Sequence, residues 1–234
     1  MPSDRDKTLA AFGEKQAASY DDRFAKASAM RDAMHLVTRL ALGELSDDAR
    51  VLCVGAGTGL EIAYLAAAFP RRRFTAVEPA PAMLTLCRQR ADREGFADRC
   101  EFHEGFLESL PEGEPYDAAT CLLVSHFLER PERSEFFAEV ARRLQPGATL
   151  VNADLASGVG TPRHARLMAV WRRMWLLCDT PVEQVDQMLT EFEKKVPLLP
   201  PAEVVELVCS AGFESPTPIL QTLLIHGWSF TRSS

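Results

Sequence analysis

The chain has 234 residues, of which 47% are hydrophobic and 25% charged, and its 33 acidic and 26 basic side chains give a formal net charge of −7. This composition excludes intrinsic disorder, and a chain of this length buries a core without disulfides or a structural metal. The acidic balance argues against binding nucleic acid mainly through phosphate contacts, although a local basic patch leaves nucleic acid open as a partner.

The start of the chain and the cysteines indicate the compartment. Residues 1–10 carry charges instead of the apolar run of a secretory signal, and no stretch approaches the roughly 18 apolar residues of a membrane span. We therefore expect a cytoplasmic protein that does not enter a membrane. The six cysteines contain no C-x-x-C pair, which favours reduced core thiols over a zinc site, and the histidines lack ligand spacing, so we predict no metal.

The N-terminal region has a helical pattern over residues 5–45 that ends near Gly43. Its last turns carry an apolar stripe with helical spacing, made of Leu36, Val37, Leu40 and Ala41. We therefore divide the chain into an N-terminal helical segment, residues 1–45, and one domain, residues 46–234.

From Arg50 onward, short apolar runs alternate with helical stretches, which is the pattern of β-α-β units and a mostly parallel sheet. The predicted strands are 50–54, 73–77, 100–103, 116–123 and 148–154. The predicted helices are 58–69, 81–94 and 132–144, the last of them stopped by a turn at Pro146 and Gly147.

Two amphipathic stretches, residues 163–178 and 181–193, interrupt this alternation and predict a helical lid insertion over residues 160–196. Two further elements complete the predicted domain: a helix at 202–211 and one long strand or a hairpin at 219–230.

The clearest chemical motif is VGAGTG, residues 54–59, where a buried strand meets a glycine-rich turn and then a helix. Glycine removes the Cβ atoms that would block a ligand, and the amides at the helix N-terminus carry partial positive charge. Leu60 stands where a dinucleotide fold has its third glycine, and the G-K-[ST] of a phosphate loop is missing. A purely structural turn stays an alternative.

Glu78 ends the second predicted strand, 23 positions after Gly55 (78 − 55 = 23). A carboxylate at this place can accept hydrogen bonds from both hydroxyls of a ribose. We favour that role over a helix cap or a surface charge.

Five blocks of the sequence resemble, in order and spacing, the class I S-adenosylmethionine-dependent methyltransferases, over roughly residues 50–155. The resemblance implies an α/β fold with a doubly wound, seven-stranded, mostly parallel sheet and an antiparallel last strand at about 221–230. The helical insertion between strands five and six is also similar to that of the carboxymethoxyuridine tRNA-modifying relatives, a weaker resemblance. The blocks are VGAGTG (54–59), VEPAPAML (77–84), HEGFLESLP (103–111), YDAATCLLVSHFL (116–128) and LQPGATLVNAD (144–154).

The family's cofactor is S-adenosyl-L-methionine, with S-adenosyl-L-homocysteine as product, and the resemblance implies which residues hold it. These are Gly55, Ala56, Gly57 and Gly59 around the amino acid part, Glu78 at the ribose, Pro79, Met83, Phe106 and Leu107 around the adenine, and Leu122 near the sulfonium.

The chain departs from the family at two positions. Cys53 stands where the family usually has an acidic residue that helps hold the cofactor's ammonium group, and Phe106 stands where an Asp commonly accepts the adenine amino group. Each missing contact costs about 1–3 kcal/mol of binding unless another group replaces it. Phe106 can partly compensate by stacking on the base.

Two residues are candidates for catalysis. His126 follows the fourth strand on the side where the resembling fold holds the acceptor, and Tyr20 lies in a segment that related chains fold over the cofactor. The alternative role for His126 is a wall or helix-cap residue, and the alternative role for Tyr20 is a core residue. Trp171 and Trp175 line an aromatic acceptor pocket or pack the lid on the core, and packing is favoured.

Two clusters of arginines break the acidic surface, and we expect both to lie in solvent. If the cluster at residues 163–173 faced the cleft, it would instead indicate an anionic acceptor or an RNA contact. The clusters are Arg163, Arg166, Arg172 and Arg173, and Arg71, Arg72 and Arg73.

The sequence therefore predicts an enzyme that transfers a methyl group to a small, partly apolar molecule. A non-catalytic adenosyl-ligand sensor or partner subunit is the alternative, because of Cys53 and Phe106, and a nicotinamide-dependent oxidoreductase ranks third. The expected partner is a small-molecule substrate, and a homodimer stays open. The sequence does not specify the acceptor or the atom methylated.

Overall fold

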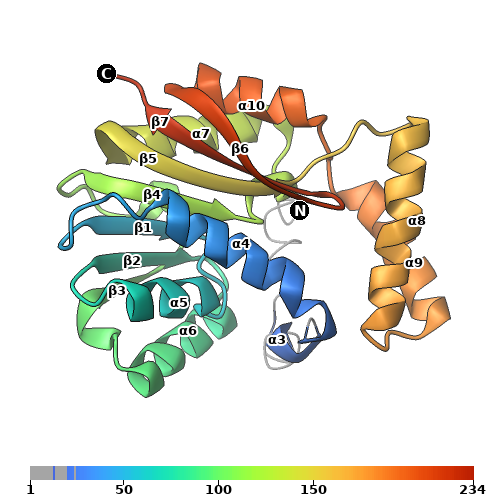
Figure 1. Ribbon diagram of the computed structural model, residues 1–234, viewed down its shortest axis with the longest axis horizontal. Helices are drawn as coiled ribbons and strands as arrows, with labels where there is room; N and C mark the ends of the chain where they lie inside the picture. The colour runs from blue at the N-terminus through green and yellow to red at the C-terminus, as the bar shows by residue number, and fades with distance from the viewer. Residues whose placement is uncertain (1–12, 14–19, 24) are drawn as a thin grey trace.

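The computed structural model describes residue 13, residues 20–23 and residues 25–234 (Figure 1), so the helix expected over 5–45 is compared only within these ranges. The strands are β1 (Arg50–Val54), β2 (Arg73–Glu78), β3 (Cys100–Glu104), β4 (Tyr116–Leu122), β5 (Leu144–Leu155), β6 (Phe213–Thr222) and β7 (Ile225–Arg232). The α-helices are α3 (Tyr20–Arg23), α4 (Ser28–Ala41), α5 (Leu60–Ala68), α6 (Pro81–Glu94), α7 (Arg130–Arg143), α8 (Pro162–Leu177), α9 (Val182–Lys195) and α10 (Pro201–Ser210). Short 3₁₀ turns are η1 (Ala25–Ala27), η2 (Ala97–Arg99), η3 (Leu107–Ser109) and η4 (Ser125–Phe127).

The strands form one sheet of seven strands in the order β3-β2-β1-β4-β5-β7-β6. The pairs from β3 to β5 are parallel, and β7 is antiparallel to both β5 and β6. The predicted α/β fold with an antiparallel last strand is confirmed. Because strand order reverses between β1 and β4, their carboxyl ends border the crevice where such sheets bind ligands.

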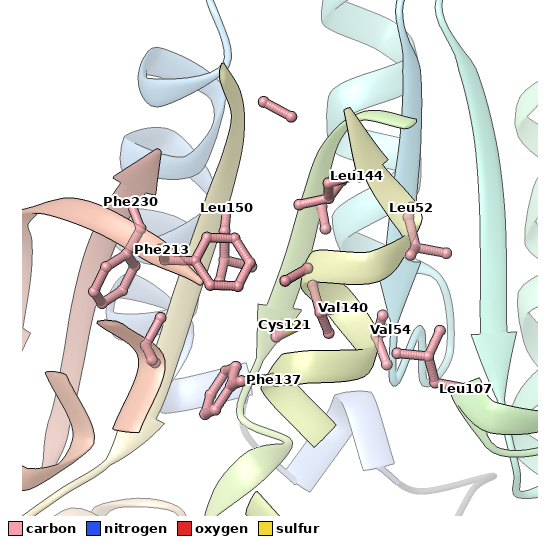
Figure 2. Close-up of a cluster of buried hydrophobic side chains, with 14 of the residues drawn as sticks. Leu52, Val54, Leu107, Cys121, Phe137, Val140, Leu144, Leu150, Phe213 and Phe230 are labelled. Atoms are coloured by element: carbon pink, nitrogen blue, oxygen red, sulfur yellow. The ribbon is translucent and has the colours of Figure 1, made fainter. Parts of the chain in front are cut away.

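Helices cover both faces of this sheet. Val51 and Cys53 of β1 are buried with the side chains of α5 and α6, whereas Leu52 and Val54 belong to the cluster on the opposite face with Phe137 of α7. Figure 2 shows this second cluster. Burial on both faces explains why β1 reads as a continuous apolar run.

Several element ends differ from the prediction, and three of these differences affect the loop, β5 and the C-terminal hairpin. The first crossover helix begins at Leu60, because Gly59 before it has a φ of 79° that no helical residue adopts. The expected turn at Pro146 and Gly147 is wrong, since both residues lie within β5, where the pairing with β4 is irregular. The C-terminal segment is a hairpin whose first strand already starts at Phe213.

Helices α8 and α9 stand beside each other at one end of the sheet (Figure 1). Trp171 and Trp175 of α8 are 7% and 9% exposed and contact edge to face, with ring centroids 6.5 Å apart. They belong to one apolar cluster with Met34 of α4 and Leu155 of β5, which confirms that these tryptophans pack the helix pair on the core.

The arginine-rich segments behave differently from each other. Arg163, Arg166 and Arg173 on α8 are exposed, as predicted, whereas Arg172 is half-buried and forms an ion pair with Asp186 of α9 at 2.6 Å. The prediction for Arg71–Arg73 is wrong at Arg72, which is 1% exposed. Its guanidinium donates hydrogen bonds to the carbonyl oxygens of Leu42, Leu45 and Ser46 and lies 3.6 Å from the Phe69 ring centroid, so burial leaves its donors satisfied.

In the part of the chain that the structure describes, no helix combines the length and the apolar character that a membrane crossing needs.

Candidate functional site

The glycine loop joins β1 to α5 in a left-handed backbone conformation. Gly55 and Gly57 have φ angles of 70° and 55°, and the amides of Gly55 and Ala56 donate to the Val77 carbonyl at 2.8 and 3.1 Å. A Cβ on Gly55 would lie 2.4 Å from a methyl carbon of Val124, whereas a Cβ on Gly57 would meet no atom within 4 Å. The loop is thus packed against the core on one side and open at Gly57.

We expect Gly55→Ala to lower the free energy of unfolding by about 2–4 kcal/mol, because left-handed strain adds to an overpacked contact. Gly57→Ala should cost only about 1–2 kcal/mol, since there the strain acts alone. Urea unfolding of both variants measures this difference. Equal losses would contradict the contact with Val124, and Gly55→Ala/Val124→Ala should recover part of the larger loss.

Glu78 is 7% exposed and bonded to backbone on both sides. Its Oε2 accepts from the Gly57 amide at 2.9 Å and its Oε1 from the Ala80 amide at 2.9 Å. Burial raises the pKa of the Glu78 carboxyl, and the two amide hydrogen bonds oppose this rise. The carboxylate therefore joins the end of β2 to the open glycine of the loop and keeps a lone pair on each oxygen.

The residues expected around an adenine lie beside Glu78 in the fold. The Gly105 amide donates to the Glu78 carbonyl at 3.2 Å, which brings Phe106 next to the end of β2. Pro79 and Phe106 are half-buried. Three others pack into apolar clusters: Met83 beside Ala80, Leu107 among the core side chains of the α7 face (Figure 2), and Leu122 at the edge between two clusters.

His126 forms a buried cluster with Asp154 at the carboxyl end of β5. Its Nδ1 lies 2.7 Å from Asp154 Oδ1, and its backbone amide donates to the same oxygen at 2.9 Å. The Ser125 hydroxyl donates to Asp154 Oδ2. The two side chains are 3% and 0% exposed, and the His126 ring contacts that of Phe127 at 4.2 Å between centroids. Several contacts thus fix the imidazole in one orientation.

A third contact network ties the N-terminal part to the loop. Asp21 of α3 accepts a hydrogen bond from the Thr58 hydroxyl at 2.9 Å and forms an ion pair with Arg90 of α6 at 2.6 Å. Arg90 also donates to the Thr58 carbonyl at 2.9 Å. Tyr20, whose side chain lies outside the described part, immediately precedes Asp21.

Two features fit a nucleoside ligand. The open side of Gly57 admits a ligand close to the main chain, and the Glu78 carboxylate is held at that same glycine. These residues lie together at the end of β1 and β2, while His126 follows β4 on the other side of β1.

Sequence reasoning missed Asp154 and Asp21. Asp154 is the last residue of the block LQPGATLVNAD, and a carboxylate at the end of a buried strand next to β4 is a signal that was present in the sequence. Asp21 carried no such signal, because its partners lie far along the chain.

Known proteins resemble this chain in sequence and in fold. The family of the methyltransferase domain matches residues 51–147. The chain is 36% identical over 107 residues to the phthiotriol/phenolphthiotriol dimycocerosates methyltransferase of Mycobacterium leprae, covering 45% of this chain and 37% of that protein. It is 30% identical over 145 residues to the fatty-acid O-methyltransferase of Mycolicibacterium smegmatis, covering 62% and 47% respectively.

A solved structure shows the same fold. An O-methyltransferase family protein from Burkholderia thailandensis superposes with a TM-score of 0.61 at 18% identity, over 96% of this chain and 64% of that one. The chain spans less than half the length of the two curated relatives. Residues 51–147 thus match a methyltransferase domain, and the relatives and the shared fold show that the chain is similar to the class I S-adenosylmethionine-dependent methyltransferases.

Proposed function

We propose that the protein transfers the methyl group of S-adenosylmethionine to a hydroxyl group of a small, partly apolar molecule. The cofactor supplies the methyl group in an activated, sulfonium-bound form. The observation that supports a hydroxyl acceptor is the His126–Asp154 pair. This pair lies at the carboxyl ends of the same sheet whose strands end in the glycine loop and Glu78.

Asp154 makes His126 suitable as a general base. An ionised carboxylate only accepts hydrogen bonds, so the imidazole donates through Nδ1 and keeps the lone pair on Nε2. That nitrogen would take the proton of the acceptor hydroxyl, and the bound cofactor would supply the methyl group from its sulfonium, with S-adenosylhomocysteine as the leaving group. General-base catalysis of this kind contributes about 10²- to 10⁴-fold, and alignment of the reactants contributes about 7–11 kcal/mol more.

Apolar side chains at the carboxyl end of the sheet support an apolar acceptor. Leu122, at the end of β4, belongs to the cluster that contains Trp171 and Trp175 of α8. Water-poor walls of this kind hold an apolar molecule. The names of two similar proteins, which specify fatty acids and phthiotriol lipids, support an acceptor of this class.

We further propose that residues 160–196 act as a lid on the domain formed by 46–234, and that residues 1–45 close the cofactor site. Asp21 anchors α3 to Thr58 in the glycine loop and thereby holds Tyr20 near the cofactor. In the same assignment, Ala56 and Gly59 shape the loop, while Pro79, Met83, Phe106, Leu107 and Leu122 form the walls around the adenosyl group.

Asp21→Asn should weaken cofactor binding about 3- to 10-fold, because Arg90 loses a partly buried ion pair and α3 loses its anchor. Calorimetric titration with S-adenosylhomocysteine measures the change. Asp22→Asn is the matched control, since that exposed side chain should leave binding unaltered. Identical affinities of the two variants would show that α3 does not close the site.

The proposed function is tested with S-adenosylmethionine labelled in the methyl group. We expect label transfer to hydroxylated apolar compounds, such as long-chain hydroxy acids and phenols, and none to their deoxy analogues. Cofactor binding without transfer to any compound in a cell extract would instead favour the ligand sensor that Cys53 and Phe106 suggest.

A further inference from the structure

Glu61, the second residue of α5, is half-buried, and one oxygen of its carboxylate is buried without a hydrogen-bond partner among the described residues. Its Oε1 has less than 1 Å² of accessible surface and makes no hydrogen bond to any described residue. The Thr120 hydroxyl is close enough to lower the pKa of Glu61 in part, yet no hydrogen bond of normal geometry joins the two side chains. An unpaired buried carboxylate oxygen is costly, so its retention calls for a partner.

The groups around Glu61 are uncharged thiols. Cys53 of β1, Cys87 of α6 and Cys121 of β4 all interact with its charge, and burial raises the pKa of each thiol, so they stay neutral. Burial raises the pKa of Glu61 itself to about 7. No described cation contributes to that value, so the structure places a half-ionised acid where nothing neutralises it.

Glu61 lies at the end of the proposed cofactor site that would hold the amino acid part of S-adenosylmethionine. Cys53 pairs in register with Thr120, so both lie side by side on the face of the sheet that α5 covers. Cys53 is two residues before Gly55, and α5 begins directly after Gly59. Glu61 therefore sits beneath the glycine loop.

Cys53 also explains why Glu61 fits there. The resembling family usually has an acidic residue at position 53, and a second carboxylate next to Glu61 would repel it. The small, neutral thiol of Cys53 leaves room for the Glu61 side chain of α5. In this chain an acid on α5 therefore stands close to the neutral thiol of the strand.

We propose that Glu61 binds the ammonium group of S-adenosylmethionine in place of the missing acid at position 53. This inference rests on the cofactor assignment and adds a residue to it. The ammonium supplies the positive charge that the buried carboxylate lacks, and Glu61 in turn replaces the contact whose absence at Cys53 suggested weak binding.

The proposal predicts a pH dependence with a definite sign. Glu61 attracts the cation only when ionised, so affinity should fall by about tenfold from pH 8 to pH 6, as the acid with a pKa of about 7 takes up its proton. Binding of the ammonium lowers that pKa, so protons should be released on binding near neutral pH.

The test is calorimetric titration of wild type, Glu61→Gln and Cys53→Asp/Glu61→Leu with two ligands. S-adenosylhomocysteine carries the ammonium, and 5′-methylthioadenosine lacks the whole amino acid part. Glu61→Gln should bind S-adenosylhomocysteine about tenfold more weakly or worse, without the pH dependence, and should bind methylthioadenosine within about twofold of wild type. The double variant, which returns the acid to the strand, should recover most of the lost affinity.

Equal weakening of both ligands by Glu61→Gln would show that Glu61 only stabilises the fold and would overturn the proposal. Unchanged affinity for S-adenosylhomocysteine, or a double variant that stays as weak as the single one, would overturn it as well. A wild-type protein that binds neither ligand would overturn the proposed function too, which separates the two failures.

Discussion

Replacing His126 by Gln should lower the rate of methyl transfer to a hydroxyl acceptor about 10²- to 10⁴-fold while leaving cofactor affinity unchanged. Gln keeps a polar side chain of similar reach, but its amide cannot accept a proton at neutral pH. Single-turnover rates with labelled S-adenosylmethionine, together with calorimetric binding, separate the two effects. Wild-type rates in this variant would exclude His126 as the base.

Asp154→Asn tests how the imidazole is held. The amide can donate to Nδ1, which would move the imidazole proton to Nε2 and leave no lone pair for the acceptor. We therefore expect a loss of rate comparable to that of His126→Gln, with the histidine still present. Ser125→Ala removes only one donor to Asp154 and should cost less.

The order of elements was predictable, because buried parallel strands produce apolar runs that helices interrupt. The ends of the helices and strands were less predictable, because they depend on contacts between segments that are distant in the sequence. Pro146 and Gly147 have the composition of a turn, yet they lie within β5, where its pairing with β4 is irregular and Gly147 has a φ of 81°. Arg72 is charged and lies in a run of arginines, but the carbonyl oxygens of the segment after α4 and the Phe69 ring contact its buried guanidinium.

In the candidate site, too, local motifs were predictable from the sequence and contacts between distant residues were not. The glycine loop and Glu78 are local motifs and were visible, and the structure places the predicted residue Gly57 against Glu78. The contacts of His126 with Asp154 join residues 28 positions apart, and those of Asp21 with Arg90 join residues 69 apart. Such pairs follow from the order of strands and helices in space, which a single sequence does not specify residue by residue.

Glu78→Gln should weaken binding of S-adenosylhomocysteine about 100-fold, because a ribose hydroxyl pair donates more strongly to a carboxylate than to an amide, by roughly 3 kcal/mol in total. The amide also presents a donor to either Gly57 or Ala80, whose own amides are donors. Calorimetric titration measures the loss. Unaltered affinity would remove Glu78 from the cofactor site.

The stability of the same variant separates ligand binding from a structural role. Burial raises the pKa of Glu78, so its contribution to stability is present below the ordinary pKa of a Glu and is lost as the pH rises through the raised value. Above that raised value the fold holds an ionised carboxylate whose burial is unfavourable. Glu78→Gln removes that charge at the cost of one amide hydrogen bond, so the free energy of unfolding without cofactor should change by less than about 1 kcal/mol. A large loss of stability in urea unfolding would mean that the Glu78 carboxylate mainly stabilises the fold. A stable variant that binds the ligand poorly would instead show that Glu78 is retained for ligand binding.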